Sequence, residues 1–188
     1  MLKKVAVALA VLVVVLAGVI ATRPDSYRVE RSAAVAAPPA LLFAMVDDFH
    51  NWSAWSPWEK LDPGMKRTFA GPSAGVGAKY AWAGNDQVGE GRMTIVESQP
   101  PDRIAIKLEF LKPWESTSDT LFRFGPQGAG TRVSWAMEGR HNFMSKAFSL
   151  FASMDSMVGP DFEKGLAEIK RLAEAEAQKP AGEPKPAS

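Results

Sequence analysis

The sequence predicts an α+β domain in which a curved antiparallel sheet of about seven strands wraps on a long C-terminal helix. Two short helices follow the first strand, and an apolar transmembrane or signal helix precedes it. Three observations predict this class. Apolar residues alternate at period two over residues 27–36 and again over 65–140, and they change to helical spacing over 143–177. No segment between the strands is long enough for a crossover helix, which excludes a parallel sheet.

The chain begins with a basic and then an apolar segment. Lys3 and Lys4 precede seventeen residues, from Val5 to Ala21, that carry no charged or polar side chain. As a helix this stretch is roughly 25 Å long, near the short limit for crossing a hydrocarbon core of ~30 Å. We therefore expect a membrane anchor through residues 5–21, with the basic flank in the cytoplasm and the domain on the non-cytoplasmic side. The alternative is a signal peptide that is cleaved near Ala21, which leaves a secreted or periplasmic domain.

The first strand and the helices after it have clear boundary residues. Alternation over residues 27–36 predicts a strand, and the two prolines that follow end it. Pro39 suits the first turn of a helix, and Asn51 is expected to cap a second short helix over residues 52–55. Turn residues then divide residues 65–140 into about six strands, each with one apolar face.

The last segment has helical periodicity. Apolar residues at spacings of three or four predict a helix of some thirty residues with one stripe on the sheet. Gly159 and Pro160 predict a kink or break, with the helix restarting there. The stripe consists of Phe148, Phe151, Met154, Val158, Phe162, Leu166, Ile169 and Ala173. The predicted domain boundaries are an N-terminal segment over 1–26, a globular unit over 27–178 and a disordered, proline-rich tail over 179–188.

Composition excludes several function classes. The absence of cysteine excludes disulfides, thiolate metal sites and cysteine nucleophiles. The 22 basic residues are balanced by 21 acidic ones, so we expect no nucleic-acid partner. His50 and His141 lack ligand spacing and read as turn or loop residues, so we expect no metal and no cofactor. No catalytic motif is present. If the protein is an enzyme, we expect orientation and exclusion of water to do most of the work, aided by one buried arginine or by Tyr80 as a general acid.

Large apolar side chains on the predicted inner face favour a ligand cavity. For each of them ordinary core packing is the alternative, but together such side chains can surround a space for a flat or chain-like apolar molecule. Trp52, Trp55 and Trp58 are predicted to pack under the sheet, with a pocket rim or a membrane-facing cluster as the alternative. The candidate ligand-binding residues are Tyr80, Trp82, Met93, Ile95, Ile106, Leu108, Phe110, Phe122, Phe124, Trp135, Met137, Met154, Val158 and Phe162.

Several phrases carry a family resemblance. The most specific run from Ala37-Pro38-Pro39 through Asp48-Phe49 and Asn51-Trp52 to Trp55-Ser56-Pro57-Trp58, and further ones are Gly77 to Trp82, Gly91-Arg92-Met93, Gly130 to Val133 and Phe162 to Leu166. Over residues 27–178 the chain resembles the START-related SRPBCC superfamily, in particular its polyketide cyclase/dehydrase-like branch. The resemblance implies a helix-grip fold with an apolar pocket between the long helix and the sheet. It does not imply one chemistry, because the superfamily includes carriers, cyclases and partner-binding modules.

These observations together predict a membrane-tethered or exported protein that binds a hydrophobic small molecule or lipid in an apolar cavity. The first alternative is a polyketide cyclase/dehydratase-like enzyme, which convergent polar groups in the pocket would favour. The second is a protein-interaction module with an unidentified protein partner, which an exposed aromatic patch without a pocket would favour.

Overall fold

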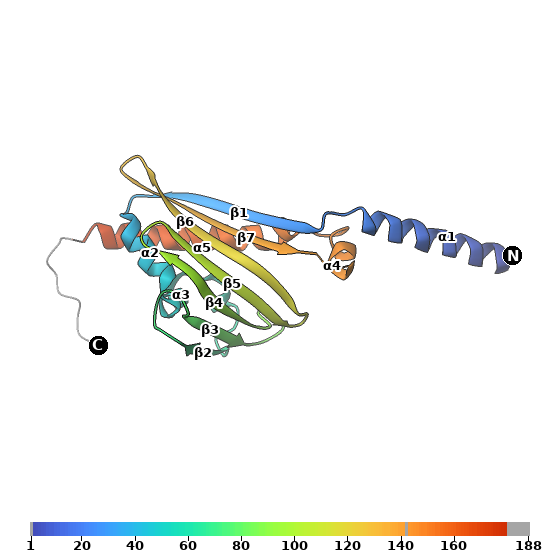
Figure 1. The fold of residues 1–188 in the computed structure, drawn as a ribbon, viewed down its shortest axis with the longest axis horizontal. Helices are drawn as coiled ribbons and strands as arrows, with labels where there is room; N and C mark the ends of the chain where they lie inside the picture. Colours follow the sequence, from blue (N-terminus) through green and yellow to red (C-terminus); the bar gives the residue numbers. More distant parts are fainter. Residues whose placement is uncertain (1, 142, 180–188) are drawn as a thin grey trace.

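The fold is described from a computed structural model that covers residues 2–141 and 143–179. Seven strands form one antiparallel sheet in the order β1-β7-β6-β5-β4-β3-β2, and the sheet curves around one face of the domain (Figure 1). This is the predicted sheet, with the first strand returning to pair with the last. The strands are β1 (Ser26–Val35), β2 (Lys66–Ala70), β3 (Lys79–Ala83), β4 (Glu90–Gln99), β5 (Arg103–Lys112), β6 (Ser116–Gln127) and β7 (Gly130–Arg140).

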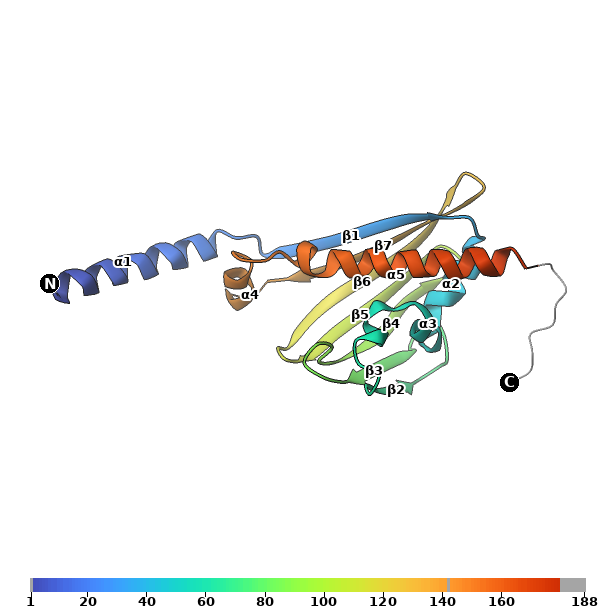
Figure 2. The same cartoon turned by 180° about the vertical axis from the view of Figure 1, so that it is seen from behind.

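The helices lie on one face of the sheet or project from its end. The long helix α5 runs along the inner face beside β1, and the short helices after β1 close the same face beneath it (Figure 2). Helix α1 extends away from the domain, with α4 next to the place where it leaves. The helices are α1 (Leu2–Ala21), α2 (Pro39–Asp47), α3 (Trp52–Trp55), α4 (Phe143–Phe148) and α5 (Met154–Ala177), with 3-10 turns over Phe49–Asn51 and Pro57–Lys60.

An aromatic core joins the sheet to α5. Along β7 the side chains of Val133, Trp135 and Met137 are buried and face inward, as period two predicts. The Trp135 ring stacks on Phe162 of α5, with centroids 4.0 Å apart and planes 9° apart. Trp55 meets Trp135 edge-on at 5.6 Å, so α3 also packs into this core.

A glycine permits the close approach of α5 to these rings. A Cβ atom at position 165 would lie 2.8 Å from Cζ3 of Trp135 and 3.4 Å from Cδ of Pro57. Both neighbours are rigid, and the indole is fixed by its stack on Phe162. The helix can therefore rest on the tryptophan only because residue 165 has no side chain.

The predicted break in the C-terminal helix is in the wrong place. The helical structure is interrupted between Phe148, where α4 ends, and Met154, where α5 begins. Helix α5 then continues through Pro160 without interruption. Ser153 begins α5, because its hydroxyl accepts from the Ser156 backbone N–H and the Ser156 side chain accepts from the Ser153 N–H. This capping box defines a new helix start that the apolar period does not reveal.

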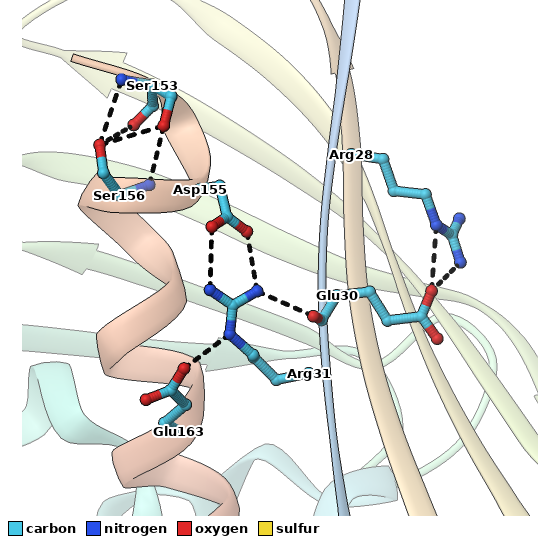
Figure 3. Close-up of polar contacts among 7 residues, drawn as sticks. All are labelled: Arg28, Glu30, Arg31, Ser153, Asp155, Ser156 and Glu163. Carbon is cyan, nitrogen blue, oxygen red and sulfur yellow. Dashed lines mark hydrogen bonds and ion pairs between the residues drawn. The ribbon is translucent and has the colours of Figure 1, made fainter.

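Contacts with β1 hold α5 on both sides of the proline. Arg31 bonds Asp155 through two nitrogens, at 2.7 and 3.0 Å, and donates from Nε to Glu163 at 2.7 Å (Figure 3). Asp155 precedes Pro160 and Glu163 follows it, so tertiary contacts span the position that lacks a helix hydrogen bond. Gly159 lies directly under the guanidinium.

Two further expectations are corrected. Phe148 and Phe151 do not face the sheet: they are 53% and 88% exposed, because α4 turns aside before α5 begins. Asn51 does not cap α3 through its side chain, which donates instead to the Ala44 carbonyl at 3.0 Å. Apart from Lys179, the predicted tail lies outside the described residues.

Candidate functional site

The fourteen candidate ligand-binding residues divide into two groups by exposure. Nine are buried within the core, and five are only half-buried. Among these residues, solvent reaches the inner face mainly at the half-buried ones. The candidate binding site is therefore narrowed from fourteen residues to the region around these five. The buried residues are Tyr80, Met93, Ile95, Ile106, Phe122, Phe124, Trp135, Met137 and Phe162, and the half-buried ones are Trp82, Leu108, Phe110, Met154 and Val158.

The strand register brings the half-buried residues to one end of the sheet. Leu108 lies opposite Ser118, Ser118 opposite Gly139, and Gly139 opposite Tyr27, which makes one row across four strands. Phe110 and Trp82 lie beyond this row, with ring centroids 5.8 Å apart. We call Tyr27, Trp82, Leu108, Phe110, Met154 and Val158 the half-buried end.

Helix α5 contributes to this end because it runs in the same direction as β1. Asp155 near its start contacts Arg31, whereas Glu174 near its finish accepts from the Ala36 backbone N–H at 2.9 Å. The first turns of α5, which carry Met154 and Val158, therefore lie beside the beginning of β1. Both side chains pack against the core cluster while remaining partly exposed.

Polar groups at this end are few, and one of them, the buried Nδ1 of His141, has no hydrogen-bond partner among the described residues. The hydroxyls of Tyr27 and Ser118 are hydrogen-bonded at 2.8 Å, and Ser118 is buried. The Tyr27 ring contacts the His141 ring at 5.0 Å. Partial burial and the positive charge of Lys146 lower the pKa of His141, so the neutral imidazole is favoured in the folded chain.

A second polar cluster surrounds Tyr80, on the β2 side of the inner face. The Tyr80 hydroxyl donates to Oε1 of Glu59 at 2.7 Å, and Nε of Arg67 donates to Oε2 at 2.6 Å. The Glu59 side chain is 7% exposed. Burial and the bond to Glu59 raise the pKa of Tyr80 well above its usual range. The Tyr80 proton is therefore held by Glu59, which weighs against the use of Tyr80 as a general acid.

Sequence reasoning missed Glu59, Arg67 and Tyr27 as members of these clusters. The Tyr27–Ser118 and Tyr80–Glu59 bonds join residues that are 91 and 21 positions apart, whereas Arg67 is eight positions from Glu59. All three contacts depend on strand register or on the 3-10 turn over Pro57–Lys60. The signal that was available was the position of Tyr80 and Tyr27 on predicted inward-facing strand positions. Nothing local to Glu59 distinguishes it from a solvated acid.

One buried donor in the core is unused. The indole Nε1 of Trp135 has no hydrogen-bond partner among the described residues, although Trp135 is only 2% exposed. Buried donors are rarely left unpaired, because the lost hydrogen bond to water is not replaced. Trp135 lies four residues before Gly139 on β7, deeper along the inner face than the half-buried end.

Two shallow depressions lie elsewhere on the surface. One, of about 250 Å³, is lined by His50, Phe69 and Lys79 among others beside β2. The other, of about 280 Å³, is on the outer face of the sheet beside Arg103 and Glu138. Neither is lined by α5. In the described part of the chain no three His, Asp or Glu side chains are grouped so as to hold a metal ion.

Comparison with known families agrees with this architecture. The family model described as "Polyketide cyclase / dehydrase and lipid transport" matches residues 26–174. The chain belongs to this family. The match begins and ends almost where β1 begins and α5 finishes, so it covers the sheet and helices but not α1. No curated protein matches the sequence.

Solved structures share the fold at low sequence identity. The di-domain ARO/CYC protein StfQ from the steffimycin biosynthetic pathway aligns with a TM-score of 0.63 at 13% identity, over 81% of this chain and 52% of StfQ. The Aha1 dimer protein from Colwellia psychrerythraea aligns with a TM-score of 0.57 at 13% identity, over 79% and 96%. Protein CV1439 from Chromobacterium violaceum gives 0.56 at 18% identity, over 81% and 99%. At these identities the likeness establishes the helix-grip fold alone.

Helix α1 is the second candidate functional element. Within the described residues it is the one helix that is long and apolar enough to cross a membrane, and a signal sequence passes the same test. Except for Ile20 its side chains are exposed. A helix that is apolar all round and not packed against protein is suited to a lipid environment.

Proposed function

We propose that this chain is a membrane-anchored protein that binds an apolar small molecule or lipid at the half-buried end of its inner face. The observation that carries the proposal is the row of partly exposed apolar side chains between the start of α5 and strands β1, β5 and β3. Such a surface is favourable for an apolar ligand because water is displaced from both partners.

The chemistry of this end favours binding over catalysis. The side chains that solvent reaches are mostly hydrocarbon, aromatic or thioether, and Met154 can adapt its shape to different ligands. The hydroxyls of Tyr27 and Ser118 are paired with each other, and Tyr80 is paired with Glu59. The unpaired Nε1 of Trp135 offers one donor to a ligand acceptor that reaches the core. We therefore propose an apolar ligand with few polar atoms.

The enzyme alternative has one specific supporting observation. The buried Glu59 carboxylate, with Tyr80 and Arg67, is a polar cluster on the inner face of a cyclase-related fold. For proton transfer to a substrate, the Tyr80–Glu59 bond must open. The interaction-module alternative has no support in the Trp52–Trp58 region that the sequence indicated, because Trp52 and Trp55 are 4% and 2% exposed and form no aromatic surface patch.

The test is native mass spectrometry of the full chain, purified from its host membrane in lipid nanodiscs and released by activation. A reproducible apolar adduct on the chain is the expected result. Leu108→Trp and Met154→Trp place a larger side chain at the half-buried end and should abolish the adduct. The control Leu111→Trp, which lies on β5 like Leu108 but is 44% exposed, should keep it. A clean mass for the unmodified chain, with no uptake from a mixture of lipids, would overturn the proposal.

A further inference from the structure

We propose that the exposed apolar side chains of the α4 segment insert into the headgroup–acyl boundary of the leaflet that α1 enters. This inference rests on the proposed anchor. We call Met144, Phe148 and Phe151 the α4 patch. The expected occupant of the patch is the lipid surface itself, so that α1 and α4 together make a two-part membrane contact.

The sheet places α4 beside the end of α1. The start of β1 pairs with the end of β7, Ser26 opposite Arg140, and the His141 N–H extends this pairing by donating to the Asp25 carbonyl at 2.8 Å. Helix α4 begins two residues after His141. In both views it lies at the junction between α1 and the domain (Figures 1 and 2).

Side-chain bonds fix α4 to the four residues that link α1 to β1. Arg23 donates from Nη2 to the Ser149 carbonyl at 3.1 Å, and Lys146 is ion-paired with Asp25. Ile20, in the last turn of α1, is 6% exposed, and α1 contacts α4. If α1 crosses the bilayer, these contacts keep α4 close to the surface of the bilayer.

The side of α4 that these bonds leave free is apolar. Met144 is 74% exposed, Phe148 53% and Phe151 88%. Phenylalanine and methionine at such exposure are unfavourable in water, whereas aromatic and apolar side chains on a short element are favoured at the membrane interface. The exposure is therefore explained if lipid covers the patch.

The charges around the patch fit a lipid surface. Within residues 22–25 and 139–152 the fixed cations are Arg23, Arg140 and Lys146, and Asp25 is the one acidic residue. Asp25 is neutralised by Lys146. The net positive charge that remains favours anionic headgroups over a second copy of the same basic surface.

Because the chain contains no cysteine, a single introduced cysteine can be labelled at one chosen position. Phe151→Cys and, as a matched control, Val76→Cys are made in the full-length protein, spin-labelled and reconstituted into vesicles of phosphatidylcholine with phosphatidylglycerol. Val76 is 60% exposed and belongs to the loop between β2 and β3. That loop lies at the end of the domain away from α1 (Figure 1). Both substitutions are at exposed positions, so thermal unfolding should be unchanged.

The measured quantity is the accessibility of each label to oxygen, which concentrates in lipid, relative to a water-soluble nickel complex. The expected ratio is severalfold higher at position 151 than at position 76. If the protein floats with the vesicles but the label at 151 is as aqueous as the label at 76, the inference is overturned and the anchor stands. If the protein does not float, the anchor fails and the inference fails with it. Aqueous labels at 151 that couple to each other would instead show contact between two copies and would also overturn it.

Discussion

At the residue scale, Arg31 connects the sheet to the helix most directly. Its guanidinium lies over Gly159, bonds Asp155 and Glu163, and donates to the Glu30 carbonyl at 2.9 Å (Figure 3). The contact with Arg31 lowers the pKa of the Asp155 carboxyl. Arg31 is a charged side chain on an otherwise apolar face of β1. It is tolerated there because two carboxylates of α5 and one carbonyl of its own strand accept its hydrogen bonds.

The first prediction is that the effect of Gly159→Ala depends on Arg31. A Cβ at position 159 would lie 2.2 Å from Nη2 of Arg31, so the guanidinium must move and its ion pairs weaken. Without Arg31, alanine should stabilise the helix by about 0.5–1 kcal/mol. A double-mutant cycle with Arg31→Ala, measured by chemical unfolding in detergent, should show this gain only in the Arg31→Ala background. Equal effects in both backgrounds would contradict the close approach of Gly159 to the Arg31 guanidinium.

The second prediction concerns pH and His141. Because its pKa is lower in the folded chain than the unfolded value of 6.5, the unfolded chain binds more protons just below that pH. The contribution of His141 to stability is therefore complete above pH 6.5 and is lost as the pH falls through the folded pKa. We expect His141→Gln to flatten the fall in the melting temperature between pH 7.5 and 5. A slope as steep as that of the unmodified chain would show that other groups cause it.

At the element scale, the positions of α4 and α5 show what apolar periodicity determines. Alternation over residues 65–140 predicted the strands correctly, since the inner face of the sheet is buried along most of its length. Helical spacing predicted α5, but it assigned Phe148 and Phe151 to the sheet-facing stripe. Periodicity identifies an apolar face without identifying what that face contacts, and here these two residues do not contact the sheet.

The candidate site was predictable to a similar degree. Inward strand parity grouped the eleven candidate residues of the strands on one face, and helical spacing placed the other three on α5. Which of them would be half-buried depends on where α5 begins. The capping box at Ser153 marks that start, and the Arg31 contacts with Asp155 and Glu163 hold the helix on both sides of Pro160. The Tyr80–Glu59 hydrogen bond depends on how the 3-10 turn over Pro57–Lys60 is placed against β3. The spacing of residues along the sequence does not predict such a contact.

The third prediction tests the packing of α5 on the core. Gly165→Ala should destabilise the fold by about 1–3 kcal/mol despite the better helix propensity of alanine, because the added methyl group meets the fixed Trp135 ring. Unfolding by urea in detergent would measure the change. Ala167→Gly, on the exposed side of the same helix, is the control and should cost about 1 kcal/mol through propensity alone. Stabilisation by Gly165→Ala would mean that α5 and Trp135 are further apart than described.

At the scale of the whole molecule, the domain and α1 have opposite surface chemistry. Apart from Lys3 and Lys4, the exposed side chains of α1 are apolar, whereas the outer face of the sheet carries ion pairs such as Arg92 with Glu109 at 2.8 Å. Lys3 and Lys4 lie at the far end of α1 from the domain. A basic pair directly before an apolar stretch is typical of an N-terminal anchor or signal peptide, so we predict that this end stays in the cytoplasm and that the domain is exported.

The fourth prediction follows from that orientation. In intact cells, the single cysteine of a Val76→Cys variant should react with a membrane-impermeant maleimide, while an Ala6→Cys variant should not. The intact mass of the membrane-associated protein should include residues 2–21, and the protein should resist extraction by alkaline carbonate. Labelling at position 76 only after cell lysis would reverse the orientation, and a mass that begins after Ala21 would establish cleavage.

The short link between α1 and β1 limits how far the domain can travel. Four residues separate Ala21 from Ser26, which allows a reach of at most ~18 Å between them even when extended. Arg23 and Asp25 within the link are bonded to the α4 region. With α1 in the bilayer, the domain cannot diffuse from one membrane to another with a cargo. Any lipid that it binds would be exchanged with the leaflet beneath it, and delivery elsewhere would require a second, mobile carrier or direct apposition of the two membranes.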